Sequence, residues 1–480
     1  GVACGCGAAA LGAGAALACV LGRDFRGHAV RPIPERFPGG PEGYLRAALW
    51  RKRAATLITW LVNLNLTERH PAPLVGLKAA LALACWRLLG AGSSEFRLGV
   101  LAFDLLSTGA LLAEYVRRPW EAEAAVRAAL REAGLPAGRG ETGRPGPEDL
   151  MGRVSPLQVL LGRPVLSSRR RTRGEAGRGA ATVLTARDLP YATEAEQAEA
   201  GDLAADLRVD VRFTLEAQRA GGRPVLLYIH GGAWLKGMGD KAGYGPLEPP
   251  APEYFAERGW VTCSMDYRLV NPKDPSAGSR WPAMIVDVKR CIRWIRDNIA
   301  QFGGAPDWVA VCGGSAGGHL ALLAGMLRGP EYQPGFEAVD TTVRAVVSYY
   351  PVVDTLDGQV SKILHDDRLP EGSGGASEAE RERASPLHYV TRCPVPGDFP
   401  RIMVIQGSRD ALCPAPKCRL FVELLRQRLA HAGRSGPGGR VCYLEFPRGR
   451  HTFDCIHSFR SWYSLLAANR LLTHCLEKPS

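Results

Sequence analysis

The stretch Gly313-Gly314-Ser315-Ala316-Gly317 follows the apolar run Trp308-Val309-Ala310-Val311-Cys312 and precedes a helix-forming run from His319 to Leu327. A serine between glycines, with a buried strand before it and a helix behind it, is typical of a turn that presents the serine as a nucleophile. Glycines are needed because strand and helix come so close that a Cβ at either flank would clash. The sequence therefore predicts that Ser315 attacks a substrate.

A second motif lies upstream, where His230-Gly231-Gly232-Ala233-Trp234 follows the strand-like run from Pro224 to Ile229. Two glycines after a buried strand allow backbone N–H groups to point at a substrate oxygen without side chains in the way. We therefore expect the amides of Gly231, Gly232 and Ala316 to form an oxyanion hole. Trp234 and His230 are weaker candidates for the substrate pocket, and His230 is expected to support the loop by hydrogen bonding.

With these motifs the chain resembles the hormone-sensitive-lipase-like branch of the α/β-hydrolases, a family of carboxylesterases and lipases. The resemblance covers roughly residues 185 to 478 and rests on four motifs in family order: His230–Trp234, Asp266-Tyr267-Arg268-Leu269, Trp281-Pro282-Ala283 and Gly313–His319. It implies an α/β-hydrolase fold, a mostly parallel central sheet flanked by helices. Two departures concern the third glycine of the family's oxyanion motif, which is Ala233 here, and the Asp that often precedes the nucleophile, which is Gly314.

The remaining members of a Ser-His-Asp triad should follow in the order serine, acid, histidine. Asp410 lies in a loop directly after the strand-like run Arg401–Ile405, and His451 follows the run Val441–Phe446. Such loops meet at the carboxyl edge of a parallel sheet, where these sheets bind ligands. The sequence therefore predicts Asp410 as the acid and His451 as the base, and both match the family's positions.

Other residues compete for these roles. Asp410 on its own is typical of an Asx turn. Asp354 also lies just past a strand-like run and is a rival acid, while His431 and His457 are rival bases. His319, on the helix behind the nucleophile, is expected to pack or form a hydrogen bond rather than to catalyse.

The expected chemistry is acyl transfer through an acyl-enzyme, in which His451 takes the Ser315 proton and Asp410 orients the imidazole. The leading hypothesis is a serine hydrolase for carboxylic esters with short to medium acyl groups, acting on a small-molecule ester or lipid. One alternative is an amide or N-formyl hydrolase, resembling arylformamidases or deacetylases. Another is a non-catalytic binding protein on the same fold. No cofactor or metal is expected, because no Cys/His cluster has zinc spacing.

Composition divides the 480 residues into three regions. Residues 1–165 are rich in Ala, Leu and Arg and predict a helical N-terminal region, with helices over 45–66, 73–89, 98–116 and 120–133. Residues 166–181 are a basic connector without apolar periodicity. Residues 182–480 alternate short β-rich runs with helical stretches and predict the catalytic domain. Polar segments such as 371–383 predict loops.

The N-terminal helices are either membrane-associated or a cap over the active site. The run Leu98–Val116 approaches the length of a membrane span, but Asp104 near its centre makes insertion marginal. Of these two alternatives we expect the first, a membrane-associated protein, with a cytoplasmic location as the alternative. The net charge of +12 is spread through the chain and no nucleic-acid module accompanies it, so we expect no nucleic-acid partner. Several of the 13 cysteines fall in apolar runs, which favours free thiols in a reducing compartment.

Overall fold

The computed structural model describes the central and C-terminal parts of the chain and one helix upstream of them. The described ranges are residues 117–118, 120–135, 182–243, 249–271, 279–356, 358–365, 377–392, 399–433, 440–455 and 458–477. The helices expected over 45–66, 73–89 and 98–116, the connector 166–181 and the rival base His457 lie outside these ranges. The helix expected over 120–133 is present over residues 120–132.

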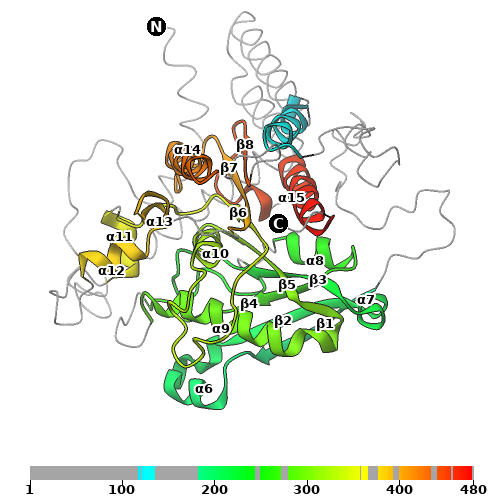
Figure 1. Cartoon of the computed structure of the whole chain (residues 1–480), viewed down its shortest axis with the longest axis vertical. Coiled ribbons are helices and arrows are strands. Elements are labelled where there is room, and N and C mark those ends of the chain that lie inside the picture. The colour runs from blue at the N-terminus through cyan, green and yellow to red at the C-terminus, as the bar shows by residue number, and fades with distance from the viewer. Residues whose placement is uncertain are drawn as a thin grey trace, which may run out of the picture. The chain divides into compact units, whose positions relative to one another are not determined.

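One mixed sheet organises the described residues (Figure 1). Its strands follow the order β1-β2-β4-β3-β5-β6-β7-β8. The strand β2 runs antiparallel to β1 and to β4, and all later neighbours are parallel. The strand bounds are β1 (Val183–Pro190), β2 (Arg208–Thr214), β3 (Arg223–Ile229), β4 (Val261–Met265), β5 (Gly304–Gly314), β6 (Ala345–Tyr349), β7 (Arg401–Gly407) and β8 (Val441–Phe446).

Helices lie in each connection between the parallel strands β3 to β8, as parallel pairing requires, and others lie beside the antiparallel strands or follow β8. Their bounds are α6 (Glu194–Ala200), α7 (Leu215–Ala220), α8 (Ala251–Ala256), α9 (Ala283–Asn298), α10 (Ala316–Met326), α11 (Gly358–Leu364), α12 (Glu378–Arg383), α13 (Pro386–Arg392), α14 (Ala415–His431) and α15 (Phe459–Glu477). Short 3₁₀ turns are η2 (Gly201–Asp206), η4 (Ile299–Phe302) and η5 (Phe453–Cys455).

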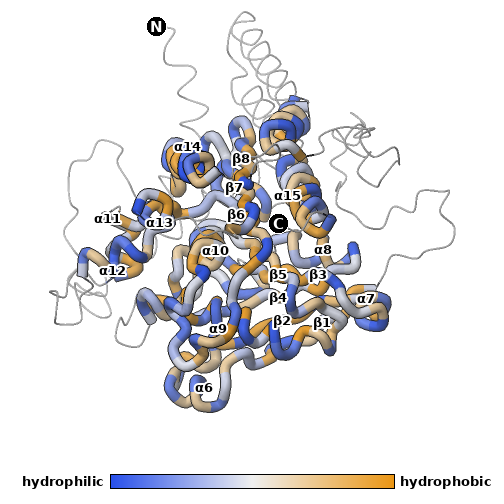
Figure 2. The backbone as a smooth tube through the Cα atoms, in the orientation of Figure 1, coloured by the Kyte–Doolittle hydropathy of each residue, from blue (hydrophilic) through white to orange (hydrophobic). Residues whose placement is uncertain are grey.

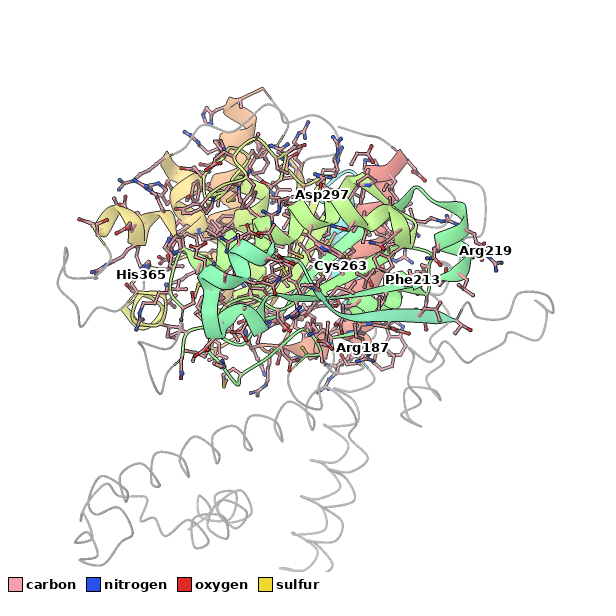
Figure 3. All side chains as sticks on the ribbon, turned by 90° about the horizontal axis from the view of Figure 1, so that it is seen from below. Arg187, Phe213, Arg219, Cys263, Asp297 and His365 are labelled. Atoms are coloured by element: carbon pink, nitrogen blue, oxygen red, sulfur yellow. The ribbon has the colours of Figure 1, made fainter. Side chains whose placement is uncertain are left out.

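The sheet separates two hydrophobic layers, because successive side chains of a strand point to opposite faces. In β3, Val225, Leu227 and Ile229 join the layer covered by α9, α10 and α14. Leu226 and Tyr228 join the layer covered by α8, α15 and the helix 120–132. Figure 1 shows α14 and α15 on opposite sides of the strands β6 to β8, and Figure 2 shows how hydrophobic the central strands are. In Figure 3, Cys263 of β4 is surrounded by side chains, whereas Arg219 reaches the periphery.

One loop expectation was wrong in part. The segment 371–383 was expected to be a loop, yet residues 378–383 form the helix α12. Its N-cap Ser377 accepts a hydrogen bond from the Glu380 amide, and the Glu380 side chain caps the Ser377 amide in return. This Ser-x-x-Glu spacing is a capping box, a start signal for a helix that the polar composition had obscured.

The topology is that of an α/β-hydrolase, so the fold expected from the resemblance is confirmed over the described residues. The N-terminal expectations are not tested there. Among the described helices, none combines the length and apolar character that crossing a bilayer requires. The run 98–116 lies outside the described ranges, and membrane association stays a prediction.

Candidate active site

Ser315 lies in a strained turn between β5 and α10. Its backbone has φ 56° and ψ −118°, a conformation that costs a non-glycine residue free energy and that accumulates at functional sites. Its amide donates to the Tyr349 carbonyl on β6 at 2.9 Å, which fixes the turn to the sheet. A Cβ added at Gly313 would lie 2.7 Å from the Ile229 carbonyl oxygen, and one at Gly317 would overlap the same carbonyl. The small residues therefore allow the helix to start directly against β3.

The side chains of Ser315, His451 and Asp410 lie together at the carboxyl edge of the sheet, each on the loop that follows a parallel strand. The imidazole Nε2 of His451 is 2.9 Å from Ser315 Oγ, and its Nδ1 is 2.7 Å from Asp410 Oδ2. His451 and Asp410 are 5% and 6% exposed, so water has little access to either polar contact. The three side chains expected from their order along the chain are therefore in contact in the structure.

Asp410 uses both of its oxygens. While Oδ2 faces His451, Oδ1 accepts the amides of Leu412 at 2.9 Å and Cys413 at 2.8 Å. The residue is therefore an Asx-turn residue and the partner of the imidazole at the same time. Because the backbone amides lock the carboxylate plane, the orientation of the imidazole is set by the fold of the loop after β7.

The contacts define the imidazole tautomer. A carboxylate is only an acceptor, so Nδ1 of His451 must donate its proton to Asp410. Nε2 is then left without a proton and accepts the hydroxyl hydrogen of Ser315. This is the protonation state in which an imidazole can act as a general base toward serine.

The rival residues are engaged elsewhere. Asp354 accepts the Leu356 amide at 3.0 Å and pairs with Lys417 at 3.1 Å. His431, at the exposed end of α14, contacts the Gln427 carbonyl at 2.7 Å. Neither of these side chains contacts Ser315, and His457 lies outside the described residues.

The loop after β3 provides the amides expected to bind an oxyanion. Gly232, Ala233 and Trp234 have φ values of 108°, 54° and 56°, an unusual run of left-handed backbone. A Cβ at Gly232 would lie 3.1 Å from the Gly239 nitrogen, so a side chain there would meet both strain and crowding. Across from this loop, Ala316 is the first residue of α10, and its amide has no acceptor within the helix.

His230 braces this loop from behind. Its Nδ1 is 2.7 Å from the Gly231 carbonyl, and its ring stacks on Tyr267 with centroids 4.5 Å apart. The Tyr267 hydroxyl donates back to the His230 carbonyl at 3.0 Å. Burial lowers the pKa of His230, so the neutral ring donates from Nδ1 to the carbonyl. The supporting role expected for His230 fits these contacts.

Trp234 and His319 form a buried aromatic contact beside the turn, with ring centroids 5.1 Å apart and nearly perpendicular planes. His319 Nε2 lies 2.7 Å from the Ala384 carbonyl. Burial lowers the pKa of His319 to about 4, which makes it neutral at physiological pH. Both side chains are thus buried where the loop after β3 meets α10. No group of His, Cys, Asp and Glu side chains suited to a metal ion occurs within the described part of the chain.

Two residues near His451 escaped sequence reasoning. The Tyr350 ring lies with its centroid 4.6 Å from the imidazole, and its hydroxyl donates to Asp454. Asp454 is three residues beyond His451, a proximity that could have drawn attention to it. Tyr350 carries no such signal, because its place depends on the register of β6 against β7.

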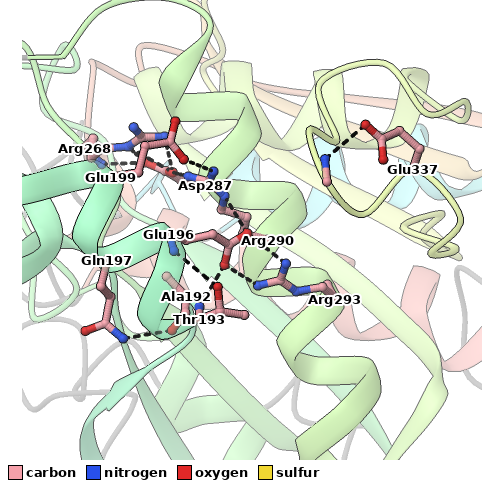
Figure 4. A network of polar contacts seen from close by, with 11 residues as sticks. Ala192, Thr193, Glu196, Gln197, Glu199, Arg268, Asp287, Arg290, Arg293 and Glu337 are labelled. Carbon is pink, nitrogen blue, oxygen red and sulfur yellow. Dashed lines mark hydrogen bonds and ion pairs between the residues drawn. The ribbon is translucent and has the colours of Figure 1, made fainter.

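A charged network fastens the motif Asp266–Leu269 to the helices (Figure 4). Arg268 forms a two-pronged ion pair with the fully buried Asp287 of α9, at 2.7 and 2.9 Å. Glu196 of α6 accepts from Arg290 at 3.0 Å and from Arg293 at 2.6 Å. The loop after β4, which runs beside the oxyanion loop, is in this way tied to α9 and α6.

The chain is similar to known proteins over part of its length. The family described as BD-FAE matches residues 211–425. A probable carboxylic ester hydrolase of Mycobacterium tuberculosis, LipM, is 35% identical over 256 residues, which are 52% of this chain and 54% of LipM. Esterase LipC of the same organism is 37% identical over 246 residues, 50% of this chain and 55% of LipC. The solved esterase 2 of Thermogutta terrifontis aligns with a TM-score of 0.44 and 21% identity, over 64% of this chain and 97% of that one.

The described residues have an α/β-hydrolase fold, and over about half of its length the chain is similar to esterases such as LipM and LipC. The chain spans about half the length of the curated relatives it matches.

Proposed function

We propose that this protein hydrolyses carboxylic esters, with Ser315 as nucleophile, His451 as general base and Asp410 as the acid that orients it. The observation that carries the proposal is the pair of contacts made by one imidazole, 2.9 Å to Ser315 Oγ and 2.7 Å to Asp410 Oδ2. Among the relatives, LipM is a probable carboxylic ester hydrolase and LipC an esterase, which supports the same reaction class.

In the first half-reaction the Ser315 oxygen attacks the ester carbonyl while its proton passes to Nε2 of His451. The imidazolium that forms is stabilised by the Asp410 carboxylate, whose Oδ1 is held by two backbone amides and whose Oδ2 faces Nδ1. The proton then moves from Nε2 to the leaving alcohol, and an acyl-enzyme remains.

In the second half-reaction His451 takes a proton from water, and the resulting hydroxide equivalent attacks the acyl carbonyl. The proton returns to Ser315 and the carboxylic acid leaves. The amides of Gly231, Gly232 and Ala316 are proposed to hold the oxyanion in both halves. Loss of one such donor typically costs on the order of 10²-fold in rate.

The proposed substrate is a small-molecule ester with a short to medium acyl group, and the reaction needs no cofactor. The test is a panel of nitrophenyl esters of increasing chain length beside matched anilides and formamides, with Ser315→Ala as control. Ester turnover that depends on Ser315 is expected. Faster turnover of anilides or formamides would favour an amide or N-formyl hydrolase, and no turnover of any member would favour a binding protein.

A further inference from the structure

A buried phenol–carboxylate pair lies next to the imidazole of His451. Tyr350 and Asp454 are 0% and 5% exposed. The Tyr350 hydroxyl donates to Asp454 Oδ1, and its ring centroid is 4.6 Å from that of His451 with the planes tilted by 55°. The imidazole therefore has three neighbours, Asp410 at Nδ1, Ser315 at Nε2 and the tilted ring of Tyr350.

Both members of the pair are fixed to the frame of the fold. Tyr350 follows β6 with φ 34°, and its amide donates to the Ile405 carbonyl of β7 at 2.7 Å. Asp454 belongs to η5, and its carbonyl accepts the Ser461 hydroxyl of α15 at 2.9 Å. A left-handed backbone at a large aromatic residue is strained and persists only where its surroundings impose it. The sheet and α15 together impose it here.

The same tyrosine accounts for Gly314, the departure next to the nucleophile. A Cβ at position 314 would lie 2.9 Å from the Tyr350 hydroxyl and 3.1 Å from its Cε2. The phenol thus fills the space that a side chain before Ser315 would occupy. Tyr350 touches the nucleophile turn and the His451 ring at once, so a shift of its ring would move both.

The burial of the Asp454 carboxyl favours its hydrogen bond with the Tyr350 hydroxyl. Burial raises the pKa of this carboxyl, while the Tyr350 hydroxyl and the nearby imidazole favour its ionised form. The carboxyl also has a hydrogen bond with its own backbone amide, and the Cys455 thiol, a weak donor, lies 3.7 Å from Oδ1. Breaking the contact with Tyr350 would leave a buried carboxylate without its main donor, a costly state.

We propose that Tyr350, tethered by Asp454, is a positioning residue that holds the His451 imidazole in the plane from which it can deprotonate Ser315. The inference rests on the proposed ester hydrolysis and adds a second support to the one given by Asp410. Tyr350 acts through His451 and does not itself exchange a proton with the substrate.

The test compares Tyr350→Phe, Tyr350→Leu and Asp454→Asn in the full chain, with nitrophenyl acetate as substrate. The active sites in a separate sample of each variant are first counted by stoichiometric labelling with a fluorophosphonate. The kcat of the unlabelled enzyme is then expressed per active site, which is the meaning of labelled site below. Tyr463→Phe and Glu123→Gln are matched controls, because Tyr463 of α15 is also a buried tyrosine whose hydroxyl meets a carboxylate, that of Glu123 in the helix 120–132, at 3.4 Å.

We expect Tyr350→Phe and Asp454→Asn to lower kcat per labelled site about five- to tenfold, and Tyr350→Leu about 100-fold, with KM within about twofold of wild type. The controls should keep the wild-type kcat. A kcat per active site equal to wild type in Tyr350→Phe and Asp454→Asn would overturn the inference. This holds even if these variants have fewer active sites, because a smaller number of folded sites would show a structural role only. A wild-type protein that neither turns over ester nor labels at Ser315 would instead overturn the proposed function.

Discussion

At the scale of single residues, Asp410 shows how one side chain can satisfy two interpretations of a sequence. Its Oδ1 is held by two backbone amides, so only Oδ2 is available to His451. In an Asp410→Asn variant the oxygen would keep the backbone amides and the NH₂ group would face Nδ1. That group donates, which would force the imidazole proton onto Nε2 and remove the base that Ser315 needs.

We therefore expect Asp410→Asn to lower kcat by about 10⁴-fold, measured on a nitrophenyl ester. Asp354→Asn, which breaks only the ion pair with Lys417, is the control and should remain close to wild type. Near-normal turnover in Asp410→Asn together with an inactive Asp354→Asn would move the acid to Asp354.

The sequence could predict the contacts of Ser315, His451 and Asp410 because each residue follows a strand that can be recognised from a short run of apolar residues. Parallel strands then bring their following loops to one edge of the sheet. The catalytic roles of these residues stay predictions. Tyr350 and Asp454 could not be predicted, since their contact depends on the register of β6 and on how η5 turns toward it, and both are set by packing distant in sequence.

At the scale of elements, the approach of α10 to β3 decides whether the nucleophile turn can form. Alanine in place of a helical glycine normally stabilises a helix by roughly 1 kcal/mol. At Gly317 the sign should reverse, because the added methyl would overlap the carbonyl oxygens of Ile229 and His230.

We expect Gly317→Ala to destabilise the fold by roughly 3 kcal/mol, measured by urea unfolding. Gly329→Ala is the control, since a Cβ there would meet nothing within 4 Å. Equal stability of the two variants would show that α10 does not press on β3 as described.

The ion pairs between α6 and α9 lead to a second prediction at this scale, which concerns how stability depends on pH. Burial alone would raise the pKa of Glu196, but hydrogen bonds from Arg293 and the Thr193 amide, together with the charge of Arg290, lower it to about 2. Since the folded pKa lies below the ordinary value near 4.5, the stability that Glu196 contributes is present above pH 4.5 and is lost as the pH falls toward 2.

Glu196→Gln should therefore be less stable than wild type by roughly 1–2 kcal/mol at pH 7, with a gap that narrows steadily below pH 4.5. Urea unfolding of both proteins across this range provides the measurement. The exposed Glu194→Gln, on the same helical turn, is the control. A gap that stays constant with pH would mean that the carboxylate charge is not what holds α6 to α9.

At the scale of the whole molecule, the helix 120–132 is part of the hydrolase core. Val126 and Leu130 are fully buried in the layer that contains β8 and α15. Glu121 forms an ion pair at 2.5 Å with Arg448, which lies in the loop that leads to His451. Glu132 forms an ion pair with Arg426 at 2.6 Å. Composition placed this helix with an N-terminal region ending at residue 165, because helical periodicity does not reveal which surface a helix covers. That boundary stays a prediction, since residues 136–181 lie outside the described ranges.

We expect Leu130→Ala to lower the free energy of unfolding by about 2–4 kcal/mol, as seen when a leucine is removed from a packed core. Trp120→Ala, at a side chain 54% exposed, should change it by less than about 1 kcal/mol. Chemical denaturation followed by tryptophan fluorescence would measure the Leu130 variant. An unchanged midpoint would contradict the assignment of this helix to the core.

The central claim is that one imidazole activates Ser315. The most direct measurement is the rate of fluorophosphonate labelling, with the modified peptide identified by mass spectrometry, in wild type and in a folded His451→Gln variant. The account predicts one label per chain on Ser315 in wild type and a rate at least about 10³-fold slower in the variant. Labelling of Ser315 at the wild-type rate without His451, or labelling of a different residue, would contradict it.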